Sequence, residues 1–300
     1  MFLNIHGTTQ SYLADLAYTQ NQMNRAQSQI SSGLKVQTPA DDPGAVAEIL
    51  QVQAQIGQNQ QVQTNLGAVS SELGSADSVL QSAVTAVQNA ITLAAQGANS
   101  NLNGSDRANI ATQVQALQET LVGISQTVVN GRYIFSGDQD TQPAYQLDPT
   151  QPNGVKQLTN APSTRQILDA GGAPIAVAKT AQDIFDNANG SVFAAIQSLI
   201  TALQTGTTDN ITQASTDLKT ASGVLNQQLA FYGETENRIT TATGIAQRFQ
   251  TAQEQQLSTL RDADIPTVAV QLNQEQVTQQ ASIAVEAQMA QVKNLFSLLG

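Results

Sequence analysis

The chain has no cysteine, no tryptophan and one histidine among its 300 residues, and only 12% of them are charged. Without cysteine it can form neither a disulfide nor a thiolate nucleophile or metal ligand. Lys and Arg number 12 against 23 Asp and Glu, which gives a net charge of -11. Nucleic acid and anionic membranes both require clustered cations. The composition therefore predicts neither a nucleic-acid partner nor a membrane partner.

Long apolar runs are missing as well. Nothing approaches the roughly 20 apolar residues of a membrane-spanning helix, and the first residues lack the basic and apolar stretches of a secretory signal. By these rules alone we expect a soluble cytosolic protein. Neutral polar residues take the place of charges, and aromatic residues make up 4% of the chain. Such a composition favours a long thin apolar seam over a thick spherical core.

Residues with catalytic or metal-binding chemistry are sparse. His6 is the only histidine, and no partner for acid–base or nucleophilic chemistry is evident. The acidic pairs at 41–42 and 262–264 could suggest metal ligands, but a proline follows each within two residues, which favours helix capping. The further ligands and the glycine of a calcium loop are missing. We therefore predict a non-enzymatic protein without catalytic, cofactor-binding or metal-binding residues.

Both ends of the chain carry a seven-residue apolar repeat. Steps of three and four residues predict an N-terminal coiled-coil helix whose seam is Leu13, Leu16, Gln20, Met23, Gln27, Ile30 and Leu34. The last predicted helix has the same spacing at Val285, Met289, Val292, Phe296 and Leu299. The ten apolar members of these two sets form the predicted assembly interface. Polar seam residues cost stability and fix register, which indicates a particular partner.

Between the ends, long helical patterns flank a different segment. The longest seam spans 66–94, and a third helix, capped by Ser105 and Asp106, follows a turn over 97–104. Helices resume over 192–203, the seven-residue spacing continues at Ile211, Leu218 and Leu225, and a further helix is predicted from about 234 to 260. Most of the prolines and several short apolar runs lie between these helical stretches, which predicts a small β-rich insertion.

We therefore predict a mainly α fold. A long helical bundle and coiled coil is formed by paired N- and C-terminal segments, and it carries the small β-rich insertion. The predicted domains are a terminal coiled-coil domain (1–40 and 262–300), a long-helix core domain (41–137 and 183–261) and the insertion (138–182).

The terminal helices bury little apolar surface relative to the entropy of ordering them. We expect them to complete their burial only against neighbouring subunits, as in folding coupled to binding. An ordinary stable intramolecular coiled coil is the alternative. Head-to-tail contacts between such subunits generate rings or open helical filaments.

Two separate terminal motifs resemble those of the flagellin superfamily. The N-terminal motif is ISSGLKV at 30–36 followed by PADDP at 39–43. The C-terminal motif is STLRDADI at 258–265, with QQAS at 279–282 and LFSLL at 295–299. Within the superfamily, NGRYIFSG at 130–137 and DIFD at 183–186 are more similar to the hook-associated protein 3 family than to filament flagellins. The resemblance covers the chain outside 138–182.

The resemblance implies a structural subunit that joins hook to filament in the bacterial flagellum. It implies export through the flagellar type III apparatus without a cleaved signal, which replaces the cytosolic expectation by a secreted, extracellular one. The implied partners are the first hook-associated protein, flagellin, further copies of the chain in a ring or helical layer, and a cytoplasmic export chaperone. A flagellin-type filament subunit is the alternative, and an unrelated helical secretion or tail component is a more distant one.

Overall fold

The computed structural model describes the backbone of residues 5–298 and the side-chain surroundings of residues 10–288. Within that backbone, seven helices, several of them long, accompany eight strands of two or three residues. The chain forms two compact units, Met1–Gln58 with Gln250–Gly300, and Asn59–Phe249. The long helices α2 (Pro43–Gly97) and α6 (Thr208–Arg261) contribute residues to both units. The predicted mainly α fold with small strand pairs is confirmed.

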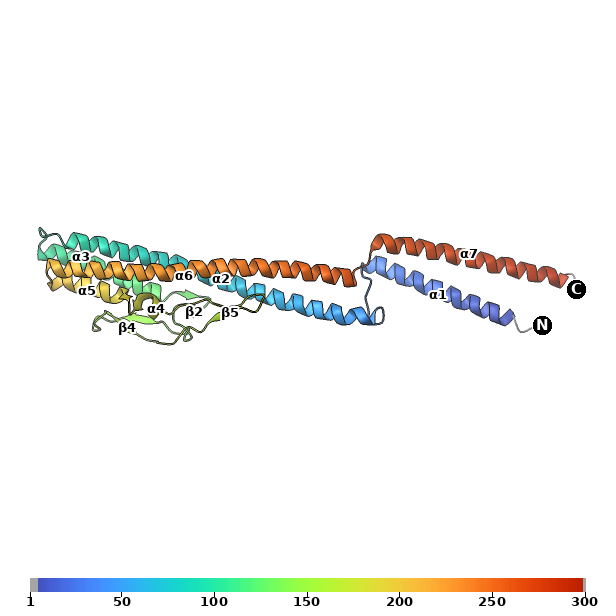
Figure 1. Ribbon diagram of the computed structural model, residues 1–300, viewed down its shortest axis with the longest axis horizontal. Coiled ribbons are helices and arrows are strands. Elements are labelled where there is room, and N and C mark those ends of the chain that lie inside the picture. Colours follow the sequence, from blue (N-terminus) through green and yellow to red (C-terminus); the bar gives the residue numbers. More distant parts are fainter. Residues whose placement is uncertain (1–4, 299–300) are drawn as a thin grey trace. The chain divides into compact units, whose positions relative to one another are not determined.

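The first unit pairs the two ends of the chain. Helix α1 (Ile5–Ser32) lies beside the antiparallel helix α7 (Ile265–Leu298) (Figure 1). Helix α1 ends at Ser32, and the next residue, Gly33, has a φ of 74°, a conformation that glycine adopts without strain. Directly beyond it, Leu34 and Asp262 form an antiparallel bridge, which we call the joint. In the joint the Lys35 amide donates to the Arg261 carbonyl at 2.7 Å.

Helix α2 begins as its sequence predicts. The Asp42 carboxylate accepts a hydrogen bond from the Ala45 amide at 3.1 Å, and Pro43 is the first helical residue. The predicted seam over 66–94 is also confirmed, because each of its members is buried or half-buried. They are Leu66, Val69, Leu73, Ala76, Leu80, Val84, Val87, Ile91 and Ala94.

Two predicted helix boundaries were wrong. Helix α3 (Gly104–Ser125) is capped by Asn103, whose side chain accepts from the Asp106 amide at 2.9 Å. Asp106 is the third helical residue, and its carboxylate accepts from the Asn103 amide in return, so the pair forms a capping box. Helix α6 begins at Thr208 and not near residue 234, because a continuous buried stripe that includes Leu218 and Leu225 precedes the predicted start.

The strands form four separate antiparallel pairs. The first pair, β1 (Val128–Val129) with β2 (Arg132–Tyr133), turns through Asn130 and Gly131, both with positive φ, as a type I′ hairpin requires. The other pairs are β3 (Tyr145–Leu147) with β4 (Val155–Gln157), β5 (Gln166–Leu168) with β6 (Pro174–Ala176), and β7 (Asp186–Asn187) with β8 (Gly190–Ser191).

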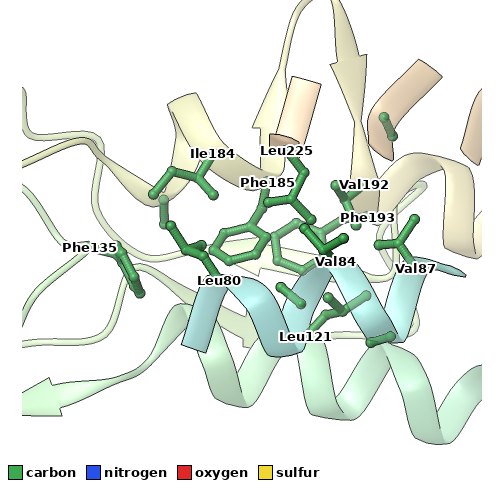
Figure 2. Close-up of a cluster of buried hydrophobic side chains, with 14 of the residues drawn as sticks. Leu80, Val84, Val87, Leu121, Phe135, Ile184, Phe185, Val192, Phe193 and Leu225 are labelled. Atoms are coloured by element: carbon green, nitrogen blue, oxygen red, sulfur yellow. The ribbon is translucent and has the colours of Figure 1, made fainter. Parts of the chain in front are cut away.

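Aromatic side chains tie this irregular segment to the long helices of the second unit. Phe185, at the end of α4 (Ala181–Phe185), stacks on Phe193 of α5 (Val192–Thr205) with ring centroids 5.6 Å apart. Phe135 meets Phe185 edge-on at 6.2 Å. Figure 2 shows these rings among apolar side chains from all the long helices of the unit, such as Leu80 and Leu121. One continuous core therefore holds the insertion and the helices together.

Candidate assembly surface

The antiparallel pair of α1 and α7 is the candidate functional site, because parts of both terminal motifs lie on these helices and other parts form the joint beside them. The joint closes one end of the pair with backbone hydrogen bonds, including that from the Ala263 amide to the Gly33 carbonyl at 2.9 Å. Further along the pair, Gln279 Nε2 donates to Gln20 Oε1 at 2.9 Å. Backbone and side-chain contacts thus set the register of the two helices.

The seam of α1 differs from the predicted one at alternate positions. Leu13, Gln20 and Gln27 are exposed, whereas Thr19 and Ala26 are buried. The buried and half-buried positions repeat at steps of four and three: Tyr12, Leu16, Thr19, Met23, Ala26 and Ile30. The predicted repeat placed Gln20 and Gln27 in the seam and therefore missed their small neighbours Thr19 and Ala26. Their spacing from the other seam members was the signal that could have found them.

Helix α7 turns a polar face towards α1. Beyond Val268 and Leu272, its half-buried positions are Glu275, Gln279, Ser282 and Glu286, at the same steps of three and four residues. Large apolar residues of α7 face outward instead: Val270 and Val277 are each 66% exposed, and Val285 is 51% exposed. These three valines are seven and eight residues apart, so they form one stripe along the helix. We call it the outer stripe.

The outer stripe has the character of a contact surface. Single exposed apolar residues are ordinary on soluble proteins, but a row of them on one helix face marks a place where another protein binds. Helix α1 adds exposed apolar side chains of its own, Leu13 at 57% and Tyr18 at 64%. The terminal pair therefore leaves apolar surface for a further partner.

The ten predicted interface residues fall into three groups. Leu13 and Val285 are exposed, while Leu16, Met23, Ile30 and Leu34 are half-buried. Met289, Val292 and Phe296 lie on helix α7, but their side chains are outside the described part of the chain, as is the whole of Leu299. The structure brings the α1 and α7 members onto one antiparallel pair. Val270 and Val277 were missed because the sequence analysis looked for an inward seam on the last helix.

Metal sites and membrane-spanning helices are both absent from the described part of the chain. It contains no group of three or more His, Asp or Glu residues that could hold a metal ion. None of its helices is both long enough and apolar enough to cross a bilayer. The predicted capping role of the second acidic pair fits the start of α7, where Asp264 accepts a hydrogen bond from the Thr267 hydroxyl at 2.6 Å.

Known proteins resemble the chain over most of its length. The profile of the bacterial flagellin N-terminal helical region matches residues 4–140. Flagellar hook-associated protein 3 of Escherichia coli K12 is 28% identical over 238 residues, 75% of this chain and 69% of the relative. The protein of the same name from Salmonella typhimurium LT2 is 26% identical over 288 residues, 90% of each chain. The chain is thus similar to flagellar hook-associated protein 3 over most of its length.

Solved structures show that the chain has a flagellin-like helical fold. Flagellar hook-associated protein 3 of Legionella pneumophila aligns with a TM-score of 0.62 at 15% identity, over 71% of this chain and 98% of that one. The flagellar junction protein FlgL of the same organism aligns with a TM-score of 0.55 at 15% identity, over 65% and 99%. The relatives are structural proteins of the flagellum, which supports the prediction of a non-enzymatic structural protein.

Proposed function

We propose that this chain joins the hook to the filament of the bacterial flagellum. The observation that carries the proposal is the outer stripe, an apolar face on the terminal helix pair that a neighbouring subunit can cover. The similarity to known proteins supports it, because relatives are named hook-associated protein 3 and one structural neighbour is named a flagellar junction protein.

The assembly interface in this proposal is the terminal helix pair. It comprises the outer stripe and the residues predicted from the repeats: Leu13, Leu16, Met23, Ile30, Leu34, Val285, Met289, Val292, Phe296 and Leu299. The half-buried members position the two helices against each other, and the exposed members contact the neighbour. We retain the division into an assembly segment (1–40 and 262–300), a helical core (41–137 and 183–261) and an insertion (138–182) as part of this proposal.

The steps of export and assembly that we propose are those that the resemblance to flagellar proteins implies. The chain is exported by the flagellar type III apparatus, and a cytoplasmic chaperone covers its apolar terminal helices before export. Outside the cell it assembles with further copies of itself onto the first hook-associated protein, and it offers flagellin a docking surface. Apolar surface on the terminal helices supports each of these contacts, because association buries it.

A deletion strain tests the proposal. Cells without the gene should build hooks, carry no filaments and release flagellin into the medium, and a plasmid copy should restore filaments. Electron microscopy of the hook ends and immunoblots of the medium provide the two measurements. Normal filaments on the deletion strain would refute a junction role.

A flagellin-type filament subunit is the second candidate, because the matching profile is that of the flagellin N-terminal helical region. A filament subunit would extend short filament seeds when purified monomer is added. Under the junction proposal, monomer binds at the seed end without growth into long filaments. Electron microscopy of seeded reactions separates the two functions.

A further inference from the structure

A pocket of about 330 Å³ lies within the first unit, where α1 meets the first turn of α7 beside the joint. We call it the joint pocket. Ala26 and Val268 line it with buried apolar surface, at 2% and 8% exposure. Pockets of roughly 300 Å³ are at the small end of ligand sites. Its size therefore suits one inserted side chain better than a large ligand.

Two cations line the joint pocket. They are Arg25 and Lys35, two of the 12 basic residues in a chain with 23 acidic ones. Neither takes part in the ion pairs recorded among the described side chains. Arg25 donates one hydrogen bond to the Asp41 carbonyl at 3.1 Å, which leaves other guanidinium donors available. Asp264 also lines the pocket, so two of the three charged side chains in its lining are cations.

Further along the terminal pair, the described charged side chains have the opposite sign. Over residues 10–24 of α1 and 265–288 of α7, every charged side chain is acidic: Asp15, Glu275 and Glu286. The two glutamates are half-buried on the face that α7 turns towards α1. Asp15 is exposed, and none of the hydrogen bonds or ion pairs recorded among the described side chains involves it. Among the described side chains, those near the joint are therefore mostly cationic and those further along are acidic.

We propose that the joint pocket binds the Asp15 carboxylate of a second copy of this chain. Copies with a net charge of -11 repel one another, so contact between them is favoured where a cationic site meets an acidic one. The two surfaces differ, so each pairing leaves a free pocket on one copy and a free Asp15 on the other. Such a head-to-tail contact propagates into a ring or a helical layer. The inference rests on the proposed self-assembly and specifies one of its contacts.

Engineered cysteines test the contact directly, because the natural chain has none. One variant carries Gln271→Cys at the pocket, and the other carries Ala14→Cys beside Asp15, so every charge stays in place. After mild oxidation of the mixture, the mixed disulfide dimer should form. Adding Lys35→Glu to the pocket variant should lower its yield roughly tenfold, and Asp15→Lys in the other variant should restore it. High salt should also lower the yield, because exposed charges are screened.

Lys219→Glu is the matched control, since Lys219 is an exposed lysine of α6 in the second unit. It should leave the dimer yield unchanged, and circular dichroism should show native helix content in every variant. The inference would be overturned if the mixed dimer of the two cysteine variants with natural charges formed only at background yield. It would also be overturned if Lys35→Glu did not lower the dimer yield, or if Asp15→Lys did not restore it. Restoration of the yield by Glu234→Lys instead of Asp15→Lys would overturn it as well, and would indicate that another acidic surface binds the pocket. The dimer yield is measured independently of filament loss in the deletion strain. The joint-pocket contact and the junction function can therefore be refuted separately.

Discussion

Gln20 of α1 and Gln279 of α7 join two segments that are 259 residues apart in the chain through a side-chain hydrogen bond of 2.9 Å. Gln20 lies one position after the buried Thr19, at the flank of the seam, and Gln279 is half-buried on the inner face of α7. A hydrogen bond between two side-chain amides is directional, so it forms in only one register of the two helices. Apolar contacts can be kept when one helix shifts along the other. The bond therefore specifies how the two ends of the chain align.

Removing either amide should loosen the terminal pair. Gln20→Ala and Gln279→Ala should each destabilise it by about 0.5–1.5 kcal/mol, and the double variant by less than the sum. Hydrogen exchange of the α7 amides around residue 279 measures the effect. Gln274→Ala, at an exposed position of the same helix, is the control and should show no coupling to Gln20. If the loss of stability in the double variant equalled the sum of the losses in the two single variants, the hydrogen bond would have no role in stability.

The outer stripe should matter for assembly and little for the monomer. Val270→Asp or Val277→Asp places a charge where a neighbour would bury the side chain, and assembly should fail because an unpaired charge is costly to bury. Both positions are 66% exposed in the monomer, so its stability should change by no more than about 0.5 kcal/mol. Motility and flagellin in the medium report assembly. Gln276→Asp, an exposed position off the stripe, should remain motile, and equal defects in all three variants would contradict the prediction.

An ion pair fastens the insertion to the long helices of the second unit. The Arg165 guanidinium binds the Glu72 carboxylate through two hydrogen bonds, the longer of 2.9 Å, and the side chains are only 25% and 18% exposed. Glu72→Gln should destabilise the protein by about 1–3 kcal/mol, because it leaves a largely buried guanidinium without its counter-charge.

The pair of Arg132 and Asp140 is the matched control for that variant, with side chains 49% and 21% exposed. Asp140→Asn should cost at most about 1 kcal/mol, because water screens a more exposed pair. Urea unfolding gives both free energies. Equal losses for the two carboxylate-to-amide changes would show that burial does not decide their strength.

The aromatic cluster should dominate the stability of the second unit. Phe185 is fully buried, so Phe185→Ala should cost about 3–5 kcal/mol through lost burial and the cavity left behind. The same substitution at Phe249, which is 46% exposed, should cost less than about 1 kcal/mol. Denaturant unfolding of the two variants provides the comparison. A small loss at Phe185 would mean that the surrounding side chains collapse into the space.

Alkaline pH should destabilise the protein through Tyr232. Burial raises the pKa of its phenol, and its hydroxyl accepts a hydrogen bond from the Lys179 amide at 3.2 Å. Above the unfolded-state pKa of about 10 the unfolded chain loses a proton that the folded chain retains, so stability falls as pH rises.

Tyr232→Phe should flatten that fall, although it should cost about 1–3 kcal/mol at neutral pH because the Lys179 amide loses its partner. Burial also raises the pKa of Tyr145, so part of the alkaline slope should remain. Urea midpoints between about pH 8 and about pH 11 give the slope. An unchanged slope in the variant would exclude Tyr232 as its source.

Local patterns predicted those features that depend on neighbouring residues. The α2 seam was found because apolar side chains recur at helical spacing over eight turns, and its start was found because Asp42 precedes Pro43. The cap of α3 was misplaced because Asn103, Ser105 and Asp106 are all capping residues, and only the backbone conformation of Asn103 decides among them. The capping box confirms that choice.

By itself, the amino-acid sequence determined the long helices, the pairing of the two ends, the absence of thiol chemistry and the resemblance to flagellins. Only the tertiary structure decided that α7 turns Gln279 inward and Val277 outward, and that Arg165 meets Glu72. Helix formation depends on residues within a few turns, which a periodic pattern reveals. The rotation of a helix about its own axis depends on burial and hydrogen bonding summed over both partners, and those partners are hundreds of residues apart.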